Sequence, residues 1–124
     1  MTAEDIKQDF EGALVKHLLF KSKLRSFLYG TNTAESPIRD PEVCALGQWI
    51  RERRRGAYAH LAAEMTQLDT LHRRLHESAN HLMDLRLSDQ GDAGIAGLAY
   101  VQPMADQLTS LLTTLQARLQ AEVR

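Results

Sequence analysis

Cysteine, proline and aromatic residues are all scarce in this sequence of 124 residues. It contains one cysteine and three prolines, and aromatic residues make up only 6% of the chain. A single cysteine cannot form a disulfide within the chain, which excludes a disulfide-stabilised fold. The abundance of Leu, Ala, Arg, Glu and Gln is typical of helical proteins rather than of β-sandwiches. We therefore expect an all-α fold.

Long apolar runs and an excess of one charge sign are also missing. No stretch of about 18 consecutive apolar residues is present, which argues against a membrane span. The chain start lacks the basic and then apolar pattern of a secretion signal, and with no disulfide we expect a cytoplasmic protein. The formal net charge of −1 argues against a general nucleic-acid binder. The length fits a single domain over residues 1–124.

Start and stop signals predict the first helix. Thr2 and Asp5 have the spacing of a capping box. The helix is expected to run from there to about Tyr29, because Gly30 is a natural residue to follow a helix end. The polar, turn-rich residues 31–39 are expected to form a loop.

Three further helices are predicted from capping residues and apolar spacing. A short one is expected from Pro41 to about Arg53, with Asp40 as its N-cap and Cys44 in its first turn. A long helix is expected over residues 57–87, and another is expected to end near residue 123. Three long helices and one short helix predict a four-helix bundle in which the short helix carries the cysteine.

The helical phase of the histidines indicates which of them point inward. The apolar stripe of the first helix is Ile6, Phe10, Ala13, Phe20, Leu24 and Phe27, with a gap of seven residues that His17 fills. His72 occupies a position in the unbroken heptad pattern of the third helix. His76 lies one turn later on the same face. These three imidazoles should therefore point toward the bundle axis.

The other two histidines serve as an internal control. His60 is separated from His72 by about 120° around a regular helix, and His81 from His76 by about 140°. Neither can join the same site, and both are predicted to be surface residues.

The inward histidines and the cysteine suggest a metal site, although each has an ordinary alternative. A single histidine in an apolar stripe is commonly a hydrogen-bonded core residue, and a lone buried cysteine commonly acts as a small hydrophobe. Together, His17, Cys44, His72 and His76 supply three nitrogen ligands and one sulfur ligand. That set suits tetrahedral zinc. Asp69, three residues before His72, is a candidate to orient that ring, and Asp40 and Glu42 are alternatives near Cys44.

Three segments resemble the motifs of a known family. Residues 17–24 read His-Leu-Leu-Phe-Lys-Ser-Lys-Leu, residues 44–49 read Cys-Ala-Leu-Gly-Gln-Trp, and residues 72–76 read His-Arg-Arg-Leu-His. In order and spacing they resemble the three motifs of the chemoreceptor zinc-binding (CZB) domain. Phe20 stands where that family more often has tryptophan.

The resemblance implies a four-helix domain with zinc held by His17, Cys44, His72 and His76. Such domains are bacterial and cytoplasmic, and they commonly pair as homodimers. They are usually attached to a chemoreceptor signalling hairpin or to a diguanylate cyclase, to which they report zinc availability or an oxidant such as hypochlorous acid. No such output segment occurs in this sequence, which leaves the signalling partner open.

Three functions are compatible with these features. The first is a zinc-binding sensor that is not an enzyme, and the second is a helical adaptor or dimerisation module whose zinc is purely structural. The third is a metal-dependent enzyme, which would need an open coordination position that four protein ligands do not leave. The arginine-rich residues 51–55 are expected to be a solvated helix end, because positive charge suits that end of the helix dipole. A docking surface for an acidic partner is an equal alternative, whereas the net charge argues against a nucleic-acid or acidic-lipid patch.

Overall fold

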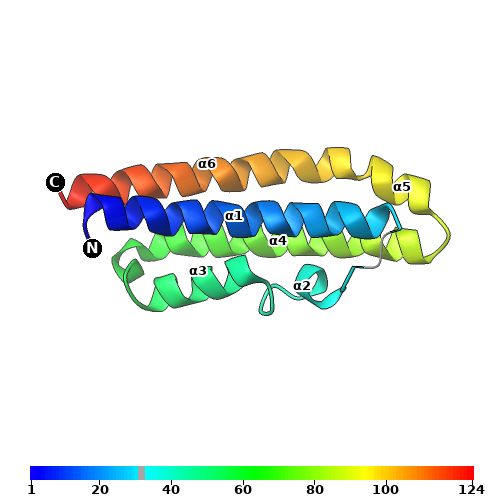
Figure 1. Ribbon diagram of the computed structural model, residues 1–124, viewed down its shortest axis with the longest axis horizontal. Coiled ribbons are helices and arrows are strands. Elements are labelled where there is room, and N and C mark those ends of the chain that lie inside the picture. Colours follow the sequence, from blue (N-terminus) through cyan, green and yellow to red (C-terminus); the bar gives the residue numbers. More distant parts are fainter. Residues whose placement is uncertain (31–32) are drawn as a thin grey trace.

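The computed structural model describes residues 1–30 and 33–124, and within them it contains helices and no strand. Three long helices, α1 (Ala3–Leu28), α4 (Ala62–Leu87) and α6 (Leu98–Glu122), lie side by side with the shorter α3 (Ala45–Arg55) (Figure 1). Three short helical segments connect them: α2 (Ser36–Arg39), η1 (Ala59–Leu61) and α5 (Gly91–Ala96). The predicted all-α four-helix bundle is confirmed.

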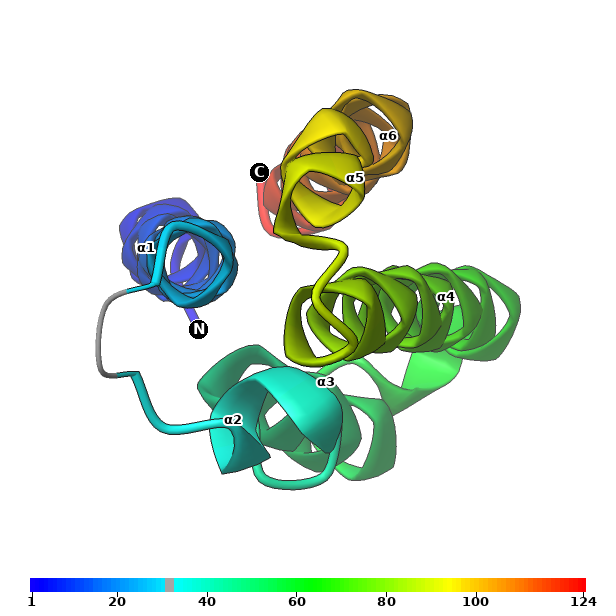
Figure 2. The same cartoon turned by 90° about the vertical axis from the view of Figure 1, so that its right-hand side faces the viewer.

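The view along the bundle shows four positions around one axis (Figure 2). α1, α4 and α6 each fill one position, and α3 shares the fourth with α2, which lies along the same edge. α1 and α4 run in the same direction, whereas α3 and α6 run in the opposite one (Figure 1). The fourth position is thus filled by two short pieces joined by a turn.

The termini of α1 follow the sequence prediction. The Thr2 hydroxyl accepts the Asp5 N–H, and the Asp5 carboxylate accepts the Thr2 N–H in return, so the capping box is present. The helix ends at Leu28, and Gly30 follows with a φ of 87°, a conformation that glycine adopts without strain.

The core is a continuous apolar cluster along the bundle axis. Heptad positions of all three long helices contribute to it, as do Leu46, Trp49 and Ile50 of α3. Three polar side chains are as buried as this core, with 1% exposure each: His17, His72 and His76. The bundle therefore places imidazoles where apolar side chains would otherwise pack.

The predicted start of the short helix was wrong. The expected helix from Pro41 begins only at Ala45, and Cys44 is its N-cap residue rather than part of its first turn. Asp40 caps a separate turn: its carboxylate accepts the Glu42 N–H at 2.9 Å and its carbonyl accepts the Cys44 N–H at 3.1 Å. This turn gives Cys44 an extended backbone.

Other boundaries also shifted. The loop predicted over residues 31–39 contains the helical turn α2, while residues 31–32 lie outside the described part of the chain. The third predicted helix begins at Ala62, after η1, and the last is divided by Gly97 into α5 and α6. In the described residues no helix combines the length and the apolar character needed to cross a bilayer.

Candidate metal centre

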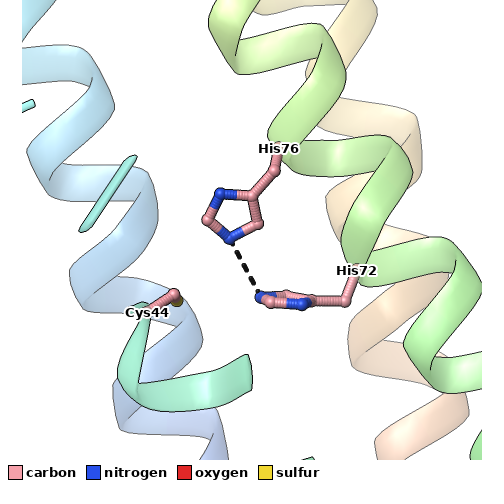
Figure 3. Close-up of side chains that lie close together, drawn as sticks. All are labelled: Cys44, His72 and His76. Atoms are coloured by element: carbon pink, nitrogen blue, oxygen red, sulfur yellow. Dashed lines mark hydrogen bonds between the residues drawn. The ribbon is translucent and has the colours of Figure 1, made fainter. Parts of the chain in front are cut away.

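Three chemically suitable side chains converge beneath the surface of the bundle. Cys44 comes from the turn before α3, while His72 and His76 come from successive turns of α4 (Figure 3). One potential ligand atom from each lies within 4.8 Å of the others, and all three residues are buried. Atoms that are distant in the sequence are thus brought within reach of a single ion.

The two histidines of α4 direct their Nε2 atoms toward each other. The Nε2 atoms of His72 and His76 are 3.1 Å apart. His76 is fixed by its other nitrogen, because Nδ1–H donates to the Ile38 carbonyl at 2.6 Å. In a neutral ring this leaves the Nε2 lone pair directed into the site. Tetrahedral zinc with bonds of about 2.0–2.1 Å separates two nitrogen ligands by about 3.3–3.4 Å. The observed separation is close to that value.

Cys44 is held against the histidines by a close approach of backbone. Gly47 lies in the first turn of α3, and a Cβ atom there would collide with the Pro41 carbonyl oxygen and lie 3.0 Å from Cε1 of His72. Only glycine lets the turn before Cys44, the start of α3 and the His72 ring pack this tightly. Gly47 therefore allows the turn that precedes Cys44 to approach the His72 ring.

His17 lies near His72 from the side of α1, but its ring nitrogens are not among the ligand atoms that converge at Cys44, His72 and His76. Its ring is 1% exposed, and neither ring nitrogen has a hydrogen-bond partner within the described residues. Phe20, one turn further along α1, has its ring centroid 4.6 Å from that of His76. Because α1 and α4 run in the same direction, His17 lies at the level of His72. Unpartnered nitrogens in a core are costly, and coordination of an ion would satisfy one of the two. The Ala105 carbonyl is the nearby acceptor for the other.

Burial lowers the pKa of all three core histidines. The pKa of His72 falls to about 3, because desolvation and the neighbouring His76 and Arg73 disfavour its charged form. Desolvation also lowers the pKa of His17 and of His76, against opposing effects of the nearby Ala105 carbonyl on His17 and of the Ile38 carbonyl on His76. All three rings are therefore neutral near pH 7, which is the form that binds a metal ion.

The sequence also made predictions about the two other histidines and about a residue that orients His72. His60 and His81 are exposed, as predicted, and His60 pairs with Glu122 at 2.7 Å. The suggested orienting role of Asp69 was wrong: its carboxylate pairs with Arg54 and Arg73. The Ile38 carbonyl takes such a role for His76 instead.

Residues 17–83 match the family model of the chemoreceptor zinc-binding domain. This match spans more than half of the chain. The chain belongs to the CZB family. No curated protein and no solved structure gave a match. The CZB match begins at His17 and includes the Cys44, His72 and His76 cluster.

Zinc is therefore the cofactor of this domain, and the cluster of Cys44, His72 and His76 fits it chemically. Thiolate sulfur and neutral imidazole nitrogen are the ligands that structural zinc prefers. CZB is a binding and signalling family rather than a catalytic one.

Proposed function

We propose that this chain is a zinc-binding sensor domain whose ion is held by His17, Cys44, His72 and His76. The convergence of Cys44, His72 and His76 carries this proposal. The buried, unpartnered nitrogens of His17 support it as the fourth ligand. Residues 1–124 would act as one domain, since core side chains run from Ile6 to Leu119.

Zinc bound by four protein ligands cross-links helices and supplies no activated water. The chain's own residues determine how easily that cross-link opens. His72 and His76 lie on one rigid helix, and His17 on another. Cys44, in contrast, follows a non-helical turn at residues 40–43. The sulfur is thus the ligand with the least rigid support.

The thiolate of Cys44 also gives the site its chemistry. A two-electron oxidant such as hypochlorous acid transfers its oxygen to the sulfur, which becomes a sulfenic acid while chloride leaves. Sulfenic acid is a poor zinc ligand, so oxidation and zinc depletion have the same structural result. In both cases the turn before α3 loses its attachment to α4. We propose that movement of this segment is the signal.

The signal requires a partner that receives it. We propose a homodimer that acts on a chemoreceptor or a diguanylate cyclase, in chemotaxis or in control of cyclic-di-GMP. The family of the chain supports this assignment.

Removal of zinc with a chelator distinguishes a sensor site from a purely structural site. Hydrogen exchange would be measured on the zinc-loaded chain and after removal of zinc. A sensor predicts faster exchange over residues 40–55 with protection kept in α1, α4 and α6, because the apolar core remains. Global loss of protection would instead show that zinc only holds the fold together, as in a helical adaptor.

A further inference from the structure

A pocket of about 410 Å³ opens beside the metal centre, between α3, α4 and the turn before Cys44. His72 is one of its lining residues, so the pocket borders the proposed zinc site. Its charged side chains are four arginines and two carboxylates: Arg51, Arg54, Arg55, Arg73, Glu42 and Asp69. We name this site the arginine pocket.

The arginine pocket carries an excess of positive charge. Four guanidinium groups face two carboxylates, which leaves two positive charges on a chain whose overall charge is −1. Arg55 has no ion pair within the part of the chain that the structure describes. The local charge therefore matches a doubly charged anion.

The guanidinium groups are already arranged in pairs around oxyanions. Glu42 is held by both Arg51 and Arg73. Asp69 is held by Arg54 at 3.3 Å and by Arg73 at 3.1 Å. Planar guanidinium groups bind carboxylate and phosphate oxygens with the same geometry. The contacts of Glu42 and Asp69 thus show how these guanidinium groups can bind the oxygens of an external anion.

We propose that the arginine pocket binds a small molecule carrying a dianionic phosphate group. The volume lies at the lower end of the range for small-ligand sites, about 300–1,000 Å³, and exceeds what a bare phosphate needs. Arg54 and Arg55, at the end of α3, provide the first contacts. Arg51 and Arg73 lie nearer the metal centre and become available when Glu42 is displaced.

Displacement of Glu42 would couple this pocket to the metal centre. Glu42 lies two residues before Cys44, and its ion pairs tie that turn to Arg51 of α3 and to Arg73, the neighbour of His72. A phosphate that takes over these guanidinium groups loosens the turn. This coupling, unlike the binding itself, rests on the proposed function, because it requires Cys44 to be a zinc ligand.

Phosphate binding can be measured by NMR on the zinc-loaded chain. Inorganic phosphate would be titrated at constant ionic strength, with chloride as the monovalent control, while the backbone amides of Gly47, Arg51 and Arg55 are followed. We expect saturable shifts with phosphate and none with chloride. Adenosine monophosphate is the second probe: tighter binding of it identifies a phosphate ester as the occupant, and tighter binding of inorganic phosphate identifies the free anion.

Matched variants make the result specific. Arg55→Gln and Arg54→Gln should each weaken phosphate binding at least threefold, whereas Arg118→Gln, which removes an exposed ion pair with Glu64 elsewhere, should leave it unchanged. Non-saturating shifts, or equal weakening by Arg118→Gln, would overturn the proposal.

The same titration on the metal-free chain keeps the two proposals apart. Saturable binding there supports the pocket even where zinc coordination fails. On the zinc-loaded chain, phosphate binding that leaves the rate of zinc transfer to a chelator unchanged would refute the coupling through Glu42. A several-fold faster transfer in saturating phosphate, lost in Arg55→Gln, would support it.

Discussion

The four side chains that we propose as zinc ligands differ in how firmly they are held. His72 and His76 stand on one helix, and His76 is further fixed by the Ile38 carbonyl. His17 lies in the core of α1 with no hydrogen bond to either ring nitrogen within the described residues. Cys44 sits at the junction between a turn and a helix. In the proposed site the histidines would thus provide a rigid frame, and the cysteine would be the ligand that can detach.

Replacement of Cys44 by alanine should weaken zinc binding by at least about tenfold, since even residues that only orient zinc ligands contribute about 10–100-fold. A competition titration against a chromogenic chelator measures this change. His81→Ala, on the exposed face of α4, is the matched control and should retain the original affinity. An unaltered affinity in Cys44→Ala would remove the sulfur from the ligand set.

Replacement of His17 by leucine distinguishes a ligand from a core residue. Leucine fills a buried position between helices without unpaired nitrogens, so the metal-free variant should be at least as stable as the metal-free original. Its zinc affinity should nevertheless drop at least about tenfold. Denaturant unfolding and the same chelator titration provide both values. A variant that is more stable and binds zinc as before would show that His17 is only a packing residue.

Periodicity could identify the inward histidines because burial follows helical phase. It also predicted that His60 and His81 are exposed, as they are. It could not identify the Ile38 carbonyl, since a backbone acceptor leaves no trace in side-chain identity. The pairing of Asp69 with two arginines was equally hidden, because it depends on how α3 packs against α4.

At the scale of elements, the close approach of α3 to the turn before Cys44 and to α4 depends on Gly47. Gly47→Ala should push the Pro41 carbonyl and the His72 ring apart and thereby widen the metal site. We expect a lower zinc affinity together with a loss of stability of about 1–3 kcal/mol, the usual cost of overpacking. Gly12→Ala in α1 is the control, because its added methyl group meets only the end of Lys16 at 3.7 Å. Equal behaviour of the two variants would contradict this role.

The other end of α3 is held to α1 through Asp9. Its carboxylate accepts hydrogen bonds from Trp49 Nε1 at 3.1 Å, from the Arg53 guanidinium at 2.7 and 2.9 Å, and from the Tyr58 hydroxyl. Burial raises the pKa of Asp9, but the hydrogen bonds from Arg53, Tyr58 and Trp49 outweigh it, and the pKa is lowered overall.

This lowered pKa predicts a pH-dependent contribution to stability. A carboxyl whose pKa is lower in the folded state stabilises the fold above its unfolded value of about 3.9 and loses that contribution as the pH falls through the folded value. Asp9→Asn should therefore cost about 2 kcal/mol at neutral pH. That difference should shrink below about pH 4. Urea unfolding of both proteins across pH measures it, and a pH-independent difference would contradict the ionic role of Asp9.

Local sequence signals predicted some element boundaries and not others. The Thr2 and Asp5 box acts within one turn, so the start of α1 followed from the sequence alone. Asp40 and Pro41 carry equally good local signals for a helix start, yet α3 begins at Ala45. The Asp40 cap serves a tight turn there, and the packing of Gly47 against Pro41 holds that turn in place. The start of α3 was thus decided by a tertiary contact, which a local sequence pattern does not contain.

At the scale of the whole molecule, the bundle combines a continuous frame with one divided position. α1, α4 and α6 extend the length of the molecule, whereas the fourth position is shared by α2, a turn and α3 (Figure 1). The metal centre lies where that divided position meets the frame. The proposed zinc cross-link at this point would hold the part of the fold with the least helical support, which is where the proposed sensor needs it.

X-ray absorption at the zinc edge tests the central claim most directly. The chain, purified without added metal and containing about one zinc ion, should give a first coordination sphere of one sulfur near 2.3 Å and three nitrogens near 2.0 Å. After Cys44→Ala the sulfur contribution should disappear. A spectrum with no sulfur, with several oxygen ligands, or with more than one sulfur per zinc would contradict a site built from His17, Cys44, His72 and His76.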